Sequence, residues 1–295
     1  MTDTDLKLEI SNSIYKYYSN SDMHHEFLRE DYTSLLLSLL DLNRKWIPAH
    51  KRKVIYSKEL RDKIENKKIK QRHIDLIHDF EDKFVNGENI NGHLSKNIYS
   101  PSSLDKLLLY WKIHHLHLNK RSATRFNQMY CNRSEYYLLF LIDKYNAYFL
   151  DITPHLKGSE FSSFDFLEII FNNNWESLIP FVVLPNVIGV SSEITDKEQL
   201  NQIWNANINY LFYNYNGKYY GNVSSVMLNG NSLEDMSCIC DLNKKLFDIS
   251  NHHNVILKDV KVMADNCILK IEVSIDTVDQ TIEIHNNIQN NIFEL

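Results

Sequence analysis

The chain has 295 residues, 43% of them hydrophobic and 24% charged, which is typical of a folded protein with one large or two modest domains. Its seven glycines form no GxGxxG or GxxxxGK[ST] pattern, which argues against Rossmann-type and P-loop nucleotide binding. The four cysteines form no CxxC pair, no secretory leader precedes them, and no apolar run approaches the roughly 20 residues of a bilayer span. We therefore expect reduced thiols, a cytoplasmic location and no membrane partner.

The net charge of −6 is unevenly distributed along the chain. Residues 1–155 carry 24 Lys and Arg against 20 Asp and Glu, whereas residues 156–295 carry 8 against 18. Within the first part, residues 44–72 hold twelve basic and three acidic side chains. A segment this basic in an acidic chain favours a surface for nucleic-acid phosphates, and a solvated lysine-rich helix is the alternative. The candidate nucleic-acid-binding residues are Lys51, Arg52, Lys53, Arg61, Lys67, Lys68, Arg72 and Arg121.

Helices are predicted for most of the first hundred residues. The first twenty residues are polar with a few aromatics, and we expect them to form a loosely docked arm. Apolar residues at helical spacing predict a helix that begins near Ser21 and ends before Pro48. "KVIYS" suggests a short strand, and Ser57 is the predicted N-cap of one long basic helix ending at Gly87. A further helix, "LDKLLLYW", is predicted after Ser103.

Residues 111–155 are predicted to form a three-stranded antiparallel meander on which these helices pack. "KIHHLHL" alternates between apolar and polar residues, "EYYLLFLID" is a β-type run, and "AYFLDITPH" follows the tight turn "KYN". The first two strands are joined by a long basic connection, "NKRSATRFNQMYCNRS". The predicted fold class is therefore α+β.

The remaining residues are predicted to form a second α+β subdomain. It comprises short helices in "FSSFDFLEIIFNNNWESLIPF", a helix at "DKEQLNQIWNAN", a hairpin that turns at Asn216-Gly217, a helix at "SLEDMSCICDLNKKLFDISN" and a C-terminal β-meander. We place the domain boundary between residues 158 and 159. Residues 1–158 then hold the basic segment and the candidate active site, and residues 159–295 form an acidic accessory or oligomerisation domain.

Three histidines in "WKIHHLHL" raise the question of catalysis. Alternation along a strand places His115 and His117 on one face and His114 on the other, where we expect a core or supporting residue. A turn at Tyr145-Asn146 would set Phe140 opposite Asp151 and Tyr136 opposite His155. The candidate catalytic residues are His115, His117, His155, Asp151, Tyr136, Arg125 and Arg133.

Three interpretations of this set remain open. In the first, no cofactor is needed: one imidazole takes the proton of an RNA 2′-hydroxyl, another protonates the leaving 5′-oxygen, and Arg or Lys stabilises the phosphoryl charge. In the second, the His-x-His strand with His155 or Asp151 binds Zn²⁺ or another divalent ion in a metal-dependent nuclease. In the third, the histidines pack in a non-catalytic nucleic-acid-binding or assembly protein.

The order of helix, "WKIHHLHL", basic connection, "YYLLFLID", tight turn and "AYFLDITPH" over residues 103–157 resembles the meander of RelE-type messenger-RNA interferases and related ribonuclease toxins. In this resemblance His155 matches the polar residue that ends the last strand, and Arg133 matches the basic group that enters the middle strand. The resemblance implies an endoribonuclease of toxin or phage-defence type acting on RNA. It also implies an antitoxin or a sibling protein subunit as a partner, and a homo-oligomer is a further expectation.

Overall fold

The protein is described here from a computed structural model. The described residues are 1–20, 31–95, 105–119, 122–125, 128–131, 134–154, 161, 163–189, 194, 196–208, 212–224, 227, 232–263 and 268–285.

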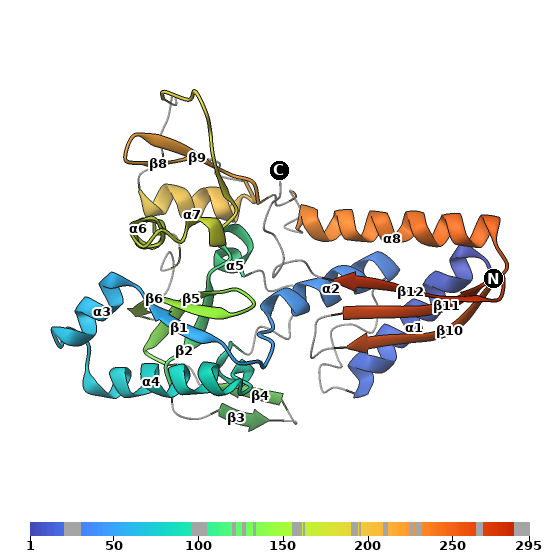
Figure 1. Ribbon diagram of the computed structural model, residues 1–295, viewed down its shortest axis with the longest axis horizontal. Coiled ribbons are helices and arrows are strands. Elements are labelled where there is room, and N and C mark those ends of the chain that lie inside the picture. Colours follow the sequence, from blue (N-terminus) through green and yellow to red (C-terminus); the bar gives the residue numbers. More distant parts are fainter. Residues whose placement is uncertain are drawn as a thin grey trace.

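The fold is α+β, as predicted, and its helices are distributed along the whole chain (Figure 1). The α-helices are α1 (Asp3–Asn20), α2 (Tyr32–Lys45), α3 (Lys58–Glu65), α4 (Gln71–Asn86), α5 (Lys106–Trp111), α6 (Asp165–Asn172), α7 (Lys197–Asn205) and α8 (Leu233–His252). Two short 3-10 helices are η1 (Asn91–His93) and η3 (Glu176–Leu178). None of the helices in the described ranges combines the length and the apolar character that a bilayer span requires.

The strands fall into four sheets within the described residues. They are β1 (Lys53–Tyr56), β2 (His114–His117), β3 (Ser122–Arg125), β4 (Gln128–Cys131), β5 (Tyr136–Ile142), β6 (Asn146–Pro154), β7 (Phe181–Val183), β8 (Phe212–Tyr215), β9 (Lys218–Asn222), β10 (Val255–Met263), β11 (Ile268–Ile275) and β12 (Val278–His285).

The central sheet has the order β1-β6-β5-β2. The predicted meander of β2, β5 and β6 is confirmed, and β1 adds a parallel strand at the β6 edge. The predicted long basic connection between β2 and β5 contains the hairpin of β3 and β4. The sheet therefore has one strand more than predicted, and a hairpin is inserted between two strands of its meander.

The register of β5 against β6 differs from the prediction. Ile142 pairs with Ala147 and Phe140 with Phe149, because the turn lies at Lys144-Tyr145, one residue earlier than predicted. A β-bulge after the Phe140–Phe149 pair then brings Asp151 opposite Leu139. A bulge adds one residue to one strand, so it shifts every later pair by one position. Such a shift is invisible in an alternating sequence pattern.

The first twenty residues form the helix α1, so the prediction of a loose arm is wrong. Leu6, Ile10 and Ile14 recur every four residues, and each is fully buried. This spacing places the three side chains on one helix face. α1 packs against β10 and α8, so an element from the start of the chain covers elements from its end.

The predicted long helix after Ser57 is two helices. Ser57 is the N-cap, as predicted, and its Oγ accepts the N–H of Leu60 at 2.9 Å. α3 ends at Glu65, and Lys67 adopts a left-handed backbone with φ 53° before α4 starts. α4 ends at Gly87, also as predicted, with φ 74°. A continuous run of helix-forming residues does not reveal this break, because it depends on the packing of both helices on the sheet.

The elements of the second half occur as predicted. Asn216 and Gly217 form the hairpin turn between β8 and β9 with φ of 51° and 77°, the values that favour Asn-Gly. α8 and the antiparallel meander β10-β11-β12 follow. Figure 1 shows α1, α8 and β10–β12 together in one group, with α2 between this group and the rest.

Two hydrophobic clusters form the core. One contains residues of α1, α2, α4 and the central sheet together with α8 and β10–β12. The other joins α5, β5 and β6 to α6, α7 and β9. Each cluster thus contains residues from both sides of the boundary predicted between residues 158 and 159, which itself lies outside the described residues.

Candidate functional site

The histidine strand β2 follows α5 after a sharp reversal of the backbone. α5 ends at Trp111, and Lys112 then adopts a left-handed conformation with φ 59° while its N–H donates to the carbonyl of Leu108 at 2.9 Å. Two residues later β2 begins at His114. The histidines therefore lie directly beside the helix from which the strand emerges.

The alternation predicted for β2 is confirmed. His114 lies opposite Phe140 on one face of the sheet, and His117 lies opposite Tyr137 on the other. His115 shares the second face, and its ring contacts the ring of Tyr137. We refer to the side of the sheet that carries His115, His117 and Tyr137 as the histidine face, in which His117 and Tyr137 are buried.

His115 lies between two aromatic rings and next to a carboxylate. Its ring centroid is 5.1 Å from that of Tyr137 and 4.9 Å from that of Phe161. Its Nδ1 is 3.4 Å from Oδ2 of Asp105, a charge contact longer than a good hydrogen bond, and Nδ1 has no hydrogen-bond partner among the described residues. The other oxygen of Asp105 accepts the N–H of Leu108 at 3.1 Å. A carboxylate held in this way can orient an imidazole for proton transfer.

His117 is held by the residue that precedes β5. Its Nδ1 is 3.2 Å from Oγ of Ser134, and the N–H of Ser134 donates to the same nitrogen at 3.4 Å. The hydroxyl of Ser134 in turn donates to the carbonyl of Tyr136. The ring of His117 lies 4.7 Å from Tyr137, which therefore contacts both histidines of the histidine face.

His114 is a core residue, as predicted. It is 3% exposed and stacks on Phe140 at 5.3 Å. Burial first, and then the nearby charges of His115, Arg52 and Lys112, lower the pKa of His114 to about 3. The imidazole is therefore neutral near pH 7 and does not serve as an acid there.

Tyr136 does not join the histidine face, so its predicted place beside the two histidines is wrong. It pairs with Pro154 and not with His155. Its ring lies 4.6 Å from the ring of His73 on α4, and it packs with the core cluster on the other side of the sheet. Strand alternation places neighbours on opposite faces, so Tyr137 takes the position we had expected for Tyr136.

Asp151 is bound by a lysine and not by a histidine. Its Oδ2 is 2.5 Å from Nζ of Lys63 on α3, and Oδ1 accepts the N–H of Ile152 at 2.8 Å. Burial raises the pKa of the Asp151 carboxyl, and Lys63 opposes that rise. No contact joins Asp151 to either histidine within the described ranges, and β5 separates its strand from β2. The predicted partnership of Asp151 with the histidine pair is therefore wrong.

Four other candidates lie wholly or partly outside the described part of the chain. The residues Arg121, Arg133 and His155 are not described. Arg125 belongs to β3 and pairs with Gln128 in the backbone register, but its side chain lies outside the description. Their predicted roles stay predictions.

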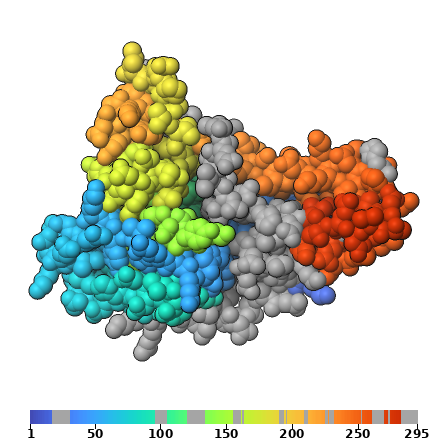
Figure 2. Space-filling view, in the orientation of Figure 1, coloured from blue at the N-terminus to red at the C-terminus, as the bar shows by residue number. Residues whose placement is uncertain are grey.

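Most of the candidate nucleic-acid-binding residues of the basic segment are exposed. These are Lys51, Lys53, Arg61, Lys67, Lys68 and Arg72. Lys68 pairs with Asp62 at 2.6 Å and Arg72 pairs with Glu135, whereas the other four have no carboxylate partner among the described residues. Figure 2 shows the blue to cyan surface that residues of this part of the chain form. Exposed cations without partners are available to phosphate.

Arg52 is an exception, because it is buried inside the fold. It is 3% exposed, its Nε donates to the carbonyl of Asp143 at 3.0 Å, and its Nη1 donates to the carbonyl of Pro48 at 2.9 Å. Burial lowers the pKa of the Arg52 guanidinium to about 10. Arg52 fixes the turn between β5 and β6, and the prediction that it contacts nucleic acid is wrong.

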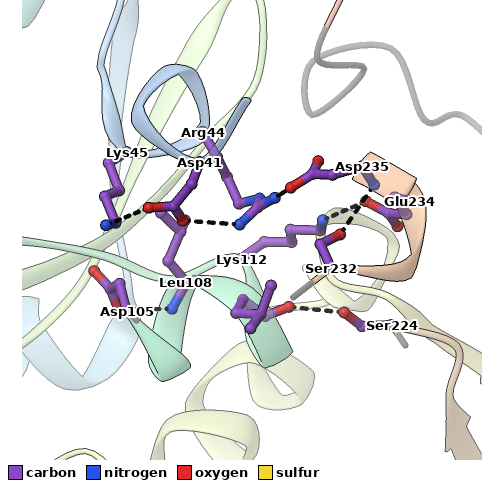
Figure 3. A network of polar contacts seen from close by, with 11 residues as sticks. Asp41, Arg44, Lys45, Asp105, Leu108, Lys112, Ser224, Ser232, Glu234 and Asp235 are labelled. Carbon is purple, nitrogen blue, oxygen red and sulfur yellow. Dashed lines mark hydrogen bonds and ion pairs between the residues drawn. The ribbon is translucent and has the colours of Figure 1, made fainter. Parts of the chain in front are cut away.

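The start of the basic segment is also buried, in a network of charges between α2 and α8 (Figure 3). Asp41 accepts from Arg44 at 3.2 Å and from Lys45 at 2.5 Å. Arg44 also pairs with Asp235 in the first turn of α8. Paired charges inside a protein hold two elements in a fixed relation, so these residues are structural.

A short basic turn contacts residues 134–136, which also contact the histidine face. We define the basic turn as residues 66–72, with Lys67, Lys68, Lys70 and Arg72 as its cations. Residues 134–136 contact His117 through Ser134 and contact the start of α4 through the Arg72–Glu135 ion pair and the tilted ring contact of His73 with Tyr136. Residues 134–136 therefore connect the basic turn, on the α4 side of the central sheet, to the histidine face on its other side.

The metal-dependent interpretation requires several ligand side chains close together. Among the described residues, no group of three or more His, Cys, Asp or Glu side chains is arranged to hold a metal ion. His155, which the metal hypothesis requires as an alternative to Asp151, lies outside them.

Two residues of the site were missed in the sequence. Asp105 is the N-cap of α5, a position we had assigned to Ser103, and Ser134 precedes β5. Asp is among the preferred N-cap residues, so its place before "KLLLYW" was a usable signal for the helix start. Its approach to His115 depends on the reversal between α5 and β2, which the sequence does not specify.

No protein-family model matches the chain, and no curated protein or solved structure is significantly similar to it.

Proposed function

We propose that the protein binds RNA through the basic turn and cleaves it at the histidine face as a metal-independent endoribonuclease. The observation that supports this proposal is the meeting of the basic turn and His117 at residues 134–136. Exposed cations position a phosphate backbone, and imidazoles exchange protons near neutral pH. Cleavage of a bound strand requires the cations that position the phosphate and the imidazoles that exchange protons to lie close together.

In the proposed reaction the 2′-oxygen attacks the adjacent phosphorus, and the bond from phosphorus to the 5′-oxygen breaks. His115, next to the Asp105 carboxylate, takes the proton of the 2′-hydroxyl, and His117 supplies a proton to the leaving 5′-oxygen. Tyr137 holds both rings. Arg125 and Arg133, cations of the predicted basic connection, stabilise the negative charge of the phosphoryl oxygens in the transition state. The products are a 2′,3′-cyclic phosphate and a 5′-hydroxyl.

The biological setting is a separate part of the proposal. A role in toxin or phage defence, with an antitoxin, a sibling subunit or a second copy of the chain as partner, rests on the RelE-type resemblance of residues 103–157. A non-catalytic RNA-binding or assembly protein is the second candidate, because both histidines of the histidine face have aromatic neighbours that would also hold structural side chains.

Cleavage of labelled single-stranded RNA tests the proposal. We expect His115→Ala and His117→Ala each to reduce the cleavage rate by about 100-fold or more, because each removes one proton-transfer group. The melting temperature should stay within a few degrees of the wild type. The matched control is His78→Ala, which removes an exposed histidine from α4 and should cleave like the wild type.

Three outcomes would contradict this scheme in different ways. Cleavage that stops with a chelator and returns with a divalent ion would favour the metal-dependent nuclease. Binding of RNA without cleavage, with or without metal, would favour the non-catalytic protein. A loss of cleavage rate in the His78→Ala control as large as that in His117→Ala would contradict the assignment of catalysis to the histidine face.

A further inference from the structure

Asp105 is a charged group beside the histidine face that the sequence did not predict. Its two carboxylate oxygens have different neighbours: Oδ1 accepts the N–H of Leu108 at the start of α5, and Oδ2 faces Nδ1 of His115 at 3.4 Å. The hydrogen bond to the helix fixes the carboxylate, so Oδ2 has a defined direction. The Asp105 side chain is 21% exposed and the His115 side chain is 13% exposed, so water screens the contact only partly.

The surroundings of His115 leave Asp105 as the one carboxylate near it in the described residues. The titratable groups that face or adjoin His115 are Asp105 on α5, His114 and His117 on β2, and Tyr137 on β5. The remaining neighbour is the uncharged ring of Phe161. Nδ1 of His115 is buried, and Asp105 offers the one acceptor near it among the described residues, so a proton on that nitrogen faces Asp105.

We propose that Asp105 is a positioning residue that holds His115 in the tautomer with the proton on Nδ1. The lone pair of the imidazole is then on Nε2, the nitrogen that would accept a proton from the RNA hydroxyl. This inference rests on the proposed function for its catalytic meaning, although the tautomer itself is a property of the protein alone. A contact of 3.4 Å is consistent with this role, because such contacts are often long before substrate binds.

The same carboxylate connects the site to the rest of the fold. Asp105 lies close enough to Arg44 for their charges to interact, and Arg44 belongs to the network that joins α2 to α8. At the other end of α5, Lys112 pairs with Glu234 of α8 at 3.2 Å (Figure 3). Both ends of α5 are thus fixed, and the helix presents Asp105 to His115 from a rigid position.

The test uses Asp105→Asn, since Asn also caps helices well and keeps the shape of the side chain. The matched control is Asp196→Asn at the N-cap of α7, where the carboxylate accepts from Glu198 and Gln199 N–H groups. Nitrogen NMR of the 295-residue chain reports the His115 tautomer. We expect the Nδ1–H tautomer in the wild type and its loss in Asp105→Asn. Asp196→Asn should leave the tautomer unchanged.

Kinetics provide the second readout. In Asp105→Asn the value of kcat should fall by about tenfold or more while KM stays near that of the wild type, because the positioning of His115 is lost and the binding of RNA is not. A wild type that cleaves no RNA would end the proposed function, yet the NMR experiment would still decide the role of Asp105. An Nε2–H tautomer in the wild type, or the same tautomer in the wild type and Asp105→Asn, would overturn the inference.

Discussion

At the scale of single residues, the three adjacent histidines have three different environments. His114 is packed against Phe140 and stays neutral, His115 faces Asp105, and His117 is held by Ser134. Residues of one type, within four positions of the sequence, thus have different surroundings. The environment of each ring, and not its residue type, decides which of them can transfer a proton.

His114 makes a measurable contribution to the pH dependence of stability. Its pKa is about 3 in the folded protein and about 6.5 in the unfolded chain, so below pH 6.5 only the unfolded chain takes up the proton. Folding is therefore destabilised as the pH falls from 6.5 toward 3. Between pH 7 and pH 5 the His114 contribution is about 2 kcal/mol.

We expect His114→Leu to reduce the loss of unfolding free energy between pH 7 and pH 5 by about this amount. Denaturant titrations at the two pH values measure it. His50, His73 and His93, whose pKa values burial also lowers, contribute to the slope that remains. His78→Leu on the exposed side of α4 is the control, and an equal reduction in that variant would contradict the assignment to His114.

At the scale of elements, the basic turn between α3 and α4 is the part of the basic segment that faces solvent most clearly. Lys67 and Lys70 are exposed and have no carboxylate partner in the described part of the chain. α4 begins with Lys70 as N-cap, and no side chain caps its first N–H groups. Positive side chains and uncapped N–H groups at one helix start both favour phosphate.

Reversing these two charges tests the binding part of the proposal. We expect Lys67→Glu combined with Lys70→Glu to weaken single-stranded RNA binding about tenfold or more at moderate salt, and to lower the salt dependence by about two phosphate contacts. Fluorescence anisotropy at several salt concentrations measures both quantities. Lys244→Glu combined with Lys245→Glu, on the exposed side of α8, makes the same charge change. Equal weakening by the two pairs would show a general charge effect and not a binding surface.

At the scale of the whole molecule, the two ends of the chain are joined. α1 packs on β10 and α8, and α2 packs on α8 (Figure 1). The buried ion pair of Arg44 and Asp235 lies at the second of these contacts, where its side chains are 4% and 5% exposed. Removing one partner of a buried pair leaves a charge that neither water nor protein satisfies fully.

We expect Asp235→Ala to lower the free energy of unfolding by about 3 kcal/mol, since among the described residues Arg44 then keeps an ion pair with Asp41 alone. Denaturant unfolding measures this loss, and hydrogen exchange should rise in both α2 and α8. Asp62→Ala removes the exposed partner of Lys68 and should leave the free energy of unfolding nearly unchanged. If both variants lost the same stability, the buried pair would not be what joins the two elements.

The sequence by itself determined the features that depend on local pattern. It predicted the α+β class, the meander of β2, β5 and β6, the Asn216-Gly217 hairpin, and the division of the histidines between two faces. These features follow from the sequence because alternation, helical spacing and turn residues act over a few positions.

The tertiary structure decided the features that depend on contacts between distant residues. The bulge that moved Asp151, the burial of Arg52, the packing of α1 on β10 and the approach of Asp105 to His115 are of this kind. Each depends on which elements pack together and at which register, and no neighbouring residue in the chain encodes that choice. For this reason the sequence identified His115 and His117, while the structure identified Asp105 and Ser134 as the residues that hold them.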